Sequence, residues 1–477
     1  MKKFIHIFFL SVFSIAFGCT IAVFSPDATD YCRPMLWKNR DVANYRQQYI
    51  YVEAEHNFIG ITYQGVTNQV YGGANDVGFG IVNTDTYNQG PNRTHGLTDG
   101  QVMFLALSHC ETVWDFIELL DSLISDTTAG LRSTHCYGII DRYGNAGIVE
   151  ASCTNYVYFS ANSSPDKYLV RTNFAITGSD SSRVGYDRYL RARALFDTLN
   201  PVSVEDVWSV ASDLVTDELN PNPLPFEGTF GILPYGYINT TNTLNRFLTT
   251  SYQIIVGQNF EDDISYPIVW GGFGQPYFTV PIPMWTKLGF VPEALTGNEN
   301  YFCNESRFLW QQVYDEGSIT YFNTFSAKSI FDYFQPLRNS VWDMFGKYIH
   351  NWNKQPVDSA NLVDVQDDFV SMVAYEYEQL HGLLVREGQV KIPDKISIDA
   401  YPNPFNSVVK ISLEVPFAQN TEFRIVDISG KIVFQKEISH GWQNIIWHPP
   451  KNLTSGTYLA ILKCGNSNVA KKLLLIK

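Results

Sequence analysis

The pattern of apolar and polar positions divides the chain into a mixed α and β part followed by an all-β tail. Apolar residues at helical spacing predict helices within 98–126, 181–199, 202–215 and 303–385, with Thr112 and Ser203 as N-caps. Short apolar or alternating runs bounded by Gly, Asn and Pro predict strands. These runs are 19–24, 35–41, 50–55, 60–63, 78–82, 168–173, 251–258 and 267–283, together with a hairpin of 137–141 and 146–151.

The pattern changes after residue 393. Short alternating segments between 396 and 477 predict a separate β-sandwich of about seven strands. Residues 387–393 form the expected linker. We therefore expect a leader at 1–18, a large domain at 19–390 whose part 303–385 is helical, and a C-terminal domain at 393–477.

Composition excludes several classes of protein. Of the 477 residues, 45% are hydrophobic, 15% aromatic and only 17% charged, which a disordered chain would not show. The net charge of −14 argues against nucleic acid as a partner, because phosphate binding needs a basic surface. Beyond residue 20, no apolar run approaches the roughly 18 residues that a spanning helix needs.

The first residues predict a secretory signal peptide. Lys2 and Lys3 precede an apolar run that is short for a membrane anchor, and Ala16 and Gly18 are the small residues expected before a cut at Cys19. Cleavage there would make Cys19 the first residue of the mature chain. Two interpretations follow: a surface lipoprotein or binding module with a lipidated Cys19, or an enzyme whose first residue is its nucleophile.

The remaining cysteines and histidines carry little further signal. Six other cysteines lie at wide, irregular spacings, so we expect at most one or two disulfides. His109-Cys110 and His135-Cys136 are isolated pairs, more typical of packing than of metal ligands, and no CxxC, HxH or HExxH motif occurs. We expect neither a metal nor a cofactor.

The first two predicted strands bring reactive groups together if they form a hairpin. A turn centred near residue 30 would pair Phe24 with Leu36 and Cys19 with Asp41, and paired residues point to the same face. A shift of one residue would separate the thiol from the carboxylate. A thiolate is a nucleophile, and a free α-amine titrates at about 7.7–8.0, so Cys19 could supply both nucleophile and base. The alternative is an Asp that merely ends its strand.

Several segments resemble one enzyme family. CTIAVF at 19–24 and PMLWKNRD at 34–41 resemble the start of N-terminal-nucleophile linear-amide hydrolases. They are most similar to the acyl-coenzyme A:6-aminopenicillanic acid acyltransferase-like group, relatives of the choloylglycine hydrolases and penicillin V acylases. GANDVGFGIVN at 73–83, LVRTN at 169–173 with SSR at 181–183, and WGGFGQP at 270–276 follow in the family's order. The resemblance covers about residues 19–290 and implies an α+β fold, a four-layer αββα sandwich.

The resemblance also implies roles for individual residues. Cys19 would be the nucleophile and Asp41 the partner of its α-amine, while Asn83 and Asn173 would donate to the oxyanion and Arg183 would support the site. Substrate-binding or supporting roles fall to Lys38, Asn39 and Arg40, although choloylglycine hydrolases carry an Arg where this chain has Lys38. From the residues alone, Asn83 could equally be a turn residue and Arg183 a helix-surface residue. Signal peptidase or self-cleavage could free Cys19.

The tail resembles a type IX secretion C-terminal sorting domain. YPNPFN at 401–406, VDISGK at 426–431, GTYL at 456–459 and KKLLLIK at 471–477 carry this resemblance, which covers about residues 396–477. It implies export through the secretion machinery to the cell surface or the medium. The alternative is a carbohydrate-binding or adhesion sandwich.

The sequence thus predicts an exported amidohydrolase or acyltransferase that acts on a small-molecule N-acyl amide through a thioester on Cys19. A dipeptidase of the related Cys-start peptidase family is an alternative with the same chemistry. The lipoprotein with a lipidated Cys19 is the alternative without catalysis.

Overall fold

A computed structural model describes the chain over residues 18–90, 92–126, 128–179, 181–215, 225–226, 228–229, 233–258, 267–315, 318–352, 359–387, 396–415, 421–437, 441–450, 452–464 and 467–477. The predicted leader and linker lie largely outside these residues. The chain divides into two compact units. The larger comprises Met1–Pro221, Asn239–Phe322 and Ser329–Leu380, and the smaller comprises Asn222–Ile238, Asn323–Lys328 and His381–Lys477.

The larger unit is an α+β structure built on two antiparallel sheets. The six-stranded sheet has the order β10-β1-β2-β12-β13-β14. Its strands are β1 (Thr20–Phe24), β2 (Met35–Asp41), β10 (Tyr168–Arg171), β12 (Thr249–Val256), β13 (Ile268–Phe273) and β14 (Ile282–Trp285). All residues of β1 and β2 are buried, which explains the continuous apolar run of β1 and leaves the polar residues of β2 inside the protein.

The second sheet is a seven-stranded meander whose strands follow chain order. They are β3 (Gln47–Val52), β4 (Phe58–Tyr63), β5 (Gly72–Asn75), β6 (Gly80–Asp85), β7 (His135–Ile140), β8 (Ala146–Ala151) and β9 (Tyr156–Ser160). Strands β1 and β2 pack against β6 and β7. The approach is close, because a Cβ on Gly138 would lie 2.8 Å from the Val23 side chain.

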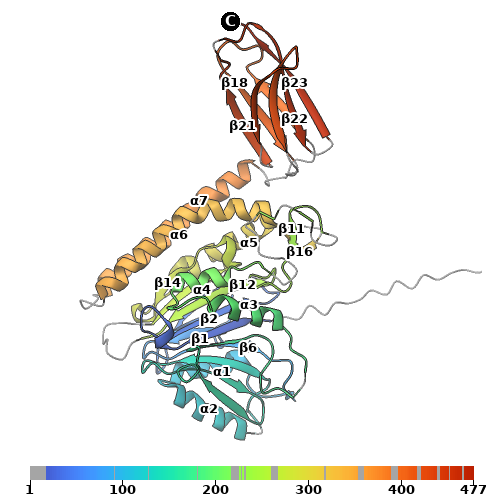
Figure 1. Cartoon of the computed structure of the whole chain (residues 1–477). Coiled ribbons are helices and arrows are strands. Elements are labelled where there is room, and N and C mark those ends of the chain that lie inside the picture. Colours follow the sequence, from blue (N-terminus) through green and yellow to red (C-terminus); the bar gives the residue numbers. More distant parts are fainter. Residues whose placement is uncertain are drawn as a thin grey trace, which may run out of the picture. The chain divides into compact units, whose positions relative to one another are not determined.

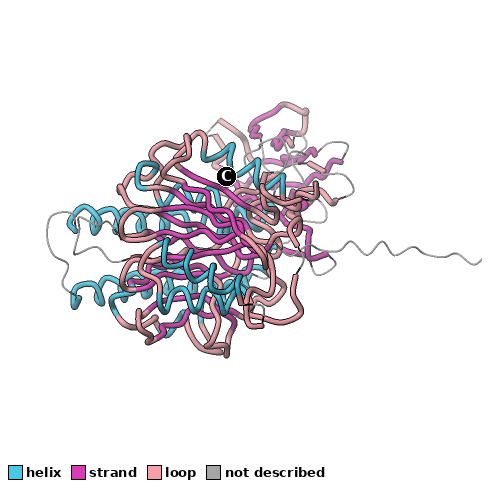
Figure 2. Tube along the Cα trace, turned by 90° about the horizontal axis from the view of Figure 1, so that it is seen from below, coloured by secondary structure: helices cyan, strands magenta, loops and turns pink. Residues whose placement is uncertain are grey.

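Helices cover the outer faces of both sheets (Figure 1). Helices α1 (Asp99–His109) and α2 (Val113–Ser125) share a core with the seven-stranded sheet. Helix α3 (Tyr186–Phe196) contacts β10, and α4 (Val204–Ala211) contacts β12. Thr112 and Ser203 form capping boxes at the starts of α2 and α4, which confirms both predicted N-caps. Figure 2 shows the strands of this unit running side by side among these helices.

The rest of the chain before the tail contains α5 (Tyr301–Val313), α6 (Thr324–Trp352) and α7 (Ser359–Glu387). Strand β11 is Tyr237–Asn239, and β15 (Tyr314–Asp315) pairs with β16 (Ser318–Asn323). The stretch 303–385, predicted to be helical, is therefore interrupted by β15 and β16, which form a strand pair. Short 3₁₀ turns occur at Pro26–Ala28, Pro276–Phe278, Thr286–Leu288 and Glu293–Leu295.

The tail forms two small antiparallel sheets with a core of their own. One has the order β17-β18-β21 and the other β20-β19-β22-β23, so the prediction of about seven strands is confirmed. The strands are β17 (Ser397–Tyr401), β18 (Val409–Val415), β19 (Glu422–Asp427), β20 (Ile432–Glu437), β21 (Gly441–Trp447), β22 (Gly456–Cys464) and β23 (Ser467–Leu475). Ile411, Phe423, Trp447 and Leu462 belong to the shared core.

All seven cysteines lie in the described part of the chain, and none of them is part of a disulfide there. Among the described residues, no helix is both long and apolar enough to cross a membrane.

Candidate active site

Cys19 lies directly before the inner strand β1, which is hydrogen-bonded to β10 on one side and β2 on the other. Its neighbour Gly18 is packed so tightly that a Cβ there would overlap the Asn173 side-chain oxygen at 1.9 Å. The backbone at the start of the predicted mature chain is therefore fixed by neighbours on both sides.

The observed hairpin register corrects the predicted one by one residue. Phe24 pairs with Met35 rather than Leu36, and Thr20 pairs with Asn39. The same register continued by one step places Cys19 opposite Arg40, not Asp41. The Pro26–Ala28 turn moves the centre of the hairpin, which the sequence pattern could not fix. As a result, Lys38 and Arg40 share the face of the thiol, and Asp41 points to the other face.

Asp41 nevertheless reaches the Gly18–Cys19 backbone through two arginines. Its fully buried carboxylate accepts hydrogen bonds from Arg246 Nη1 at 3.1 Å and Thr249 Oγ1 at 2.7 Å, and Arg188 Nη1 lies 3.8 Å away. Arg246 Nη1 also donates to the Gly18 carbonyl at 3.1 Å, and Arg188 Nη1 donates to the Cys19 carbonyl at 3.0 Å. The Gly18–Cys19 peptide thus lies within a buried cluster of one carboxylate and two guanidinium groups.

The charges of this cluster oppose one another. Burial raises the pKa of Asp41, and the guanidinium groups of Arg246 and Arg188 act in the opposite direction. Burial, and then the positive charge of Arg246, lower the pKa of Arg188 to about 10. A new positive charge beside these two arginines would therefore be disfavoured unless it contacted Asp41 directly.

The thiol of Cys19 is surrounded by polar groups on the other face of β2. Burial raises its pKa, and Lys38 provides the largest opposing effect. The charges of Asp41 and Asp85 raise the thiol pKa further, and a hydrogen bond from the Asp41 backbone N–H lowers it. The thiol therefore needs a base to become a nucleophile.

Lys38 is a buried cation bound at this face. Its Nζ donates to the Asn83 Oδ1 at 2.5 Å and to the Tyr71 carbonyl at 2.8 Å, and burial lowers its pKa. Asn83 Nδ2 in turn donates to Asp99 at 2.9 Å. Both polar atoms of the Asn83 side chain are thus engaged, so its side-chain amide would need to exchange partners before it could donate to an oxyanion.

Asn173 links the thiol region to the second sheet. Its Nδ2 donates to Thr84 Oγ1 and to the Asp85 carbonyl, each at 3.1 Å, and its Oδ1 accepts a 2.5 Å bond from Arg188. Thr84 Oγ1 donates to the Cys19 carbonyl at 3.1 Å. The structure therefore places Asn173 near the Cys19 backbone, through Thr84 and Arg188, and its oxyanion role stays a prediction.

The other three predicted residues, Asn39, Arg40 and Arg183, are held by contacts with other parts of the chain. Asn39 donates to the Ala211 and Leu244 carbonyls and so connects β2 to the chain around α4. Arg40 is buried between two aromatic rings, 4.4 Å from the centroid of Tyr63 and 4.0 Å from that of Tyr71.

Arg183 is exposed and lies over the rings of Phe174 and Tyr186, at 5.7 and 5.2 Å. The structure does not bring it to the thiol. The arginine that contacts the site from this region is Arg188, on α3.

Asp85, Asp99 and His135 form the one group within the described residues whose donor atoms could bind a metal, all lying within 4.8 Å of one another. Each donor already has a protein partner, because His135 Nδ1 lies 3.0 Å from Asp85 and Asp99 accepts from Asn83. Burial lowers the pKa of His135, but the hydrogen bond to Asp85 and the charges of Asp99 and Asp85 together outweigh it, so the net shift is upward. With Lys38 alongside, this group is a network of paired charges.

Sequence reasoning missed Arg188, Arg246 and Thr249. Arg246 lies just before β12, and Thr249 is the first residue of that strand. No sequence motif marks this stretch, and only the pairing of β12 with β2 brings both residues to Asp41. In the sequence, His135 stands out only because Cys136 follows it, whereas its partner in the structure is Asp85.

Comparisons with known proteins bear mainly on the tail. Residues 399–477 match the model of the secretion system C-terminal sorting domain, which confirms the assignment made from the tail motifs and implies transport across the outer membrane. No curated protein matches the chain. A surface component of the type-IX secretion system, PorZ of Porphyromonas gingivalis, matches 17% of this chain and 12% of its own at 18% identity, with a TM-score of 0.15.

Two solved structures are similar to a larger part of the chain. A variant of conjugated bile acid hydrolase from Clostridium perfringens has 11% identity and a TM-score of 0.34, over 56% of this chain and 92% of that one. Penicillin V acylase from Agrobacterium tumefaciens has 12% identity and a TM-score of 0.34, over 56% of this chain and 85% of that one. At TM-scores this low, neither likeness supports a conclusion about function.

Proposed function

We propose that the protein is an exported amidohydrolase with Cys19 as its N-terminal nucleophile, cleaving a linear amide C–N bond. The observation that carries the proposal is the buried cluster of Asp41, Arg188 and Arg246 around the Gly18–Cys19 peptide. The proposed architecture is a four-layer αββα sandwich over residues 19–390, with a sorting domain at 393–477. The leader at 1–18 is proposed to be a signal peptide.

Cleavage after Gly18 would create an α-amine at the nitrogen of Cys19. This nitrogen is one bond from the Gly18 carbonyl carbon, so the new amine would lie beside Asp41 and the two arginines. The arginines favour its neutral form, and Asp41 can hold the ammonium form when it appears. An amine placed in this way is a base for the thiol of the same residue.

The reaction then follows in two balanced steps. The α-amine takes the thiol proton, the thiolate attacks the amide carbonyl, and the C–N bond breaks as the ammonium returns a proton to the leaving nitrogen. Water, deprotonated by the α-amine, attacks the thioester, which releases the acid and regenerates the thiol. An amine as acceptor in place of water would give acyl transfer. Asn83 and Asn173 are proposed to donate to the oxyanion once their side-chain amides exchange their present partners, with Lys38 as the nearby cation.

The surroundings of Cys19 disfavour the lipoprotein alternative. Cys19 is half-buried, and the charges of Lys38, Asp41 and Asp85 all act on its thiol, whereas the acyl chains of a diacylglycerol adduct would require an apolar environment. The mass of the N-terminal peptide of the secreted protein tests this directly. A free Cys19 supports the enzyme, and a lipid adduct excludes it.

Catalysis itself is tested by screening N-acyl amino acids, penicillins, bile-acid conjugates and dipeptides with the secreted protein, and by intact-mass detection of an acyl adduct on Cys19 after rapid quenching. Turnover with a transient adduct supports the proposal. Dipeptides as the preferred class would support the peptidase alternative.

A further inference from the structure

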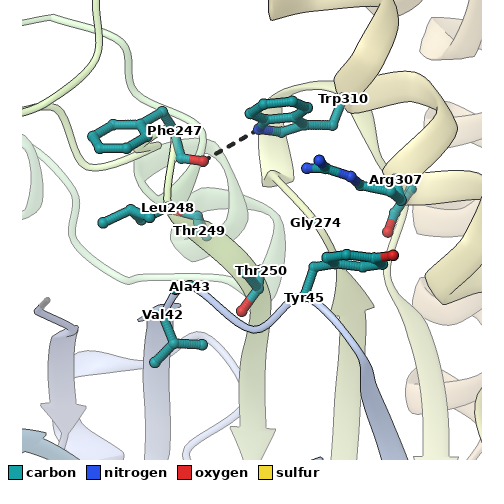
Figure 3. Close-up of a pocket in the computed structure, with 11 residues that line it drawn as sticks. Val42, Ala43, Tyr45, Phe247, Leu248, Thr249, Thr250, Gly274, Arg307 and Trp310 are labelled. Atoms are coloured by element: carbon teal, nitrogen blue, oxygen red, sulfur yellow. Dashed lines mark hydrogen bonds between the residues drawn. The ribbon is translucent and has the colours of Figure 1, made fainter. Parts of the chain in front are cut away.

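A cavity of about 200 Å³ opens in the larger unit next to the end of β2, where Asp41 lies. It lies between the chain that follows β2, the start of β12, and α5 (Figure 3). Val42 and Tyr45 line it from the first segment, Thr249 from the second, and Arg307 and Trp310 from the third. Its wall is largely aromatic and aliphatic, with a single guanidinium group.

Arg307 is held in place by aromatic rings rather than by an acid. Its guanidinium carbon lies 4.1 Å from the Trp310 ring centroid and 4.8 Å from that of Tyr45. The Trp310 indole is itself fixed, because its N–H donates to the Phe247 carbonyl at 3.2 Å. Within the part of the chain that the structure describes, no carboxylate forms an ion pair with Arg307. Figure 3 shows its guanidinium reaching into the cavity between the two rings.

The cavity begins next to Asp41, which two arginines connect to the Gly18–Cys19 peptide. Asp41 accepts a hydrogen bond from Arg246, which also donates to the Gly18 carbonyl, and Val42, the residue after Asp41, lines the cavity. Thr249 also belongs to both places, because it lines the cavity and donates to Asp41.

The chemistry determines which part of a substrate would enter this cavity. The α-amine must return its proton to the leaving nitrogen, so the leaving amine lies on the side of the α-amine and Asp41. The cavity opens on that side. Its volume suits a small amine, and the Arg307 guanidinium is a planar fork that matches a carboxylate with two parallel hydrogen bonds.

We infer that this cavity is the subsite for the leaving amine, and that Arg307 binds a carboxylate carried by that amine. The inference rests on the proposed hydrolase function. It assigns to Arg307 a role in binding and specificity and none in bond cleavage.

The test uses three probes with one acyl chain, chosen from a short panel, on the full-length secreted protein. The leaving groups are glycine, the neutral glycinamide, and aminomethylphosphonate. A charge-assisted hydrogen bond is worth enough to change affinity by about tenfold or more, so wild type should prefer the glycine conjugate by at least that factor in kcat/KM. Arg307→Gln should abolish the preference mainly through KM, and Arg307→Lys should keep part of it.

Arg142→Gln is the matched control. Arg142 is also half-buried and stacked on a tyrosine, 5.9 Å from the Tyr143 centroid, but it lies in the β7–β8 turn away from the cavity. It should keep the wild-type preference. If Arg307→Gln fails to fold, Ala43→Glu offers a second variant at an exposed position of the cavity wall, where the new carboxylate should pair with Arg307 and reduce the preference.

The outcomes separate this inference from the proposed function. Equal turnover of the glycine and glycinamide conjugates, unchanged in Arg307→Gln, would overturn the subsite and leave the hydrolase standing. A preference for the phosphonate would overturn the carboxylate as ligand. If no conjugate is turned over, calorimetry measures binding of the glycine conjugate to the Cys19→Ala protein. Binding that is lost when Arg307→Gln is added supports the subsite without the hydrolase. Absence of binding to Cys19→Ala refutes the subsite.

Discussion

Replacement of Asp41 by Asn tests how the buried cluster serves Cys19. The substitution keeps the shape of the side chain and lets the amide oxygen accept the 2.7 Å bond from Thr249. In that orientation the amide N–H groups face Arg246 and Arg188, which are donors too. If the amide is turned around, the bond from Thr249 is lost instead. Neither orientation satisfies all the partners of Asp41.

The expected loss follows from this geometry. Removing one partner of a buried ion pair lowers the free energy of unfolding by about 3–5 kcal/mol. At about 2–4 °C per kcal/mol for a large domain, the midpoint of thermal unfolding should fall by roughly 6 °C or more. The rate should fall by about tenfold to a hundredfold, because the ammonium form of Cys19 loses a charged hydrogen-bond partner worth about 1.5–3 kcal/mol.

The assay combines kcat/KM on the best amide of the screen with alkylation of Cys19 followed by peptide mass spectrometry. Cys32 is exposed and is changed to Ser in every variant, so that it does not compete for the reagent. Asp213→Asn is the control, because it removes a half-buried partner of Arg191, bound at 2.7 and 2.9 Å, away from Cys19. It should lose little stability and no activity. A folded Asp41→Asn protein within about twofold of the wild-type rate would refute the assignment.

Four further outcomes are expected. Cys19→Ala should be exported and folded but inactive, and more than a trace of turnover in purified protein would remove Cys19 as nucleophile. Lys38→Met should slow alkylation of Cys19 at pH 8 by about tenfold, because Lys38 most strongly opposes the rise in the thiol pKa. Lys38→Arg keeps the charge and should stay close to wild type. Equal alkylation rates in Lys38→Met and wild type would contradict this role. Glu150 is bound to Arg171 at 2.6 Å and has a lowered pKa, so the carboxylate stabilises the fold above the unfolded pKa near 4.5, and this stabilisation is lost as pH falls through the folded pKa. Glu150→Gln should therefore flatten that part of the pH–stability curve. An unchanged slope would contradict this role of Glu150. Removal of residues 396–477 should leave an active hydrolase in a heterologous periplasm but block release by the native host, and an aggregated or inactive product would show that the tail is part of the enzyme.

The sequence predicted elements well where the pattern is strong. The buried strand β1, the caps of α2 and α4 and the seven strands of the tail follow from apolar runs, capping residues and turn spacing. Strand β5, made of Gly-Gly-Ala-Asn, was not predicted because glycines carry no strand propensity; it forms because β4 and β6 pair with it on either side.

The site shows where sequence reasoning stops. The pairing of β1 with β2 was expected, but its register was wrong by one residue, and a single step exchanges which side chains share the face of the thiol. Arg246 is separated from Asp41 by more than 200 residues and meets it only because β12 pairs with β2. Such a contact depends on sheet order, which local patterns do not encode.

Taken together, the two faces of β2 divide the proposed chemistry between them. On one face, burial raises the pKa of the Cys19 thiol, and Lys38 limits that rise. On the other face, Asp41, Arg188 and Arg246 surround the nitrogen that would become the α-amine. While that nitrogen remains in the Gly18–Cys19 peptide it cannot accept a proton, so the thiol has no base. In the proposed mechanism, removal of the leader therefore supplies the missing catalytic group, and the cluster that holds the Gly18 carbonyl beforehand is the one that sets the protonation of the amine afterwards.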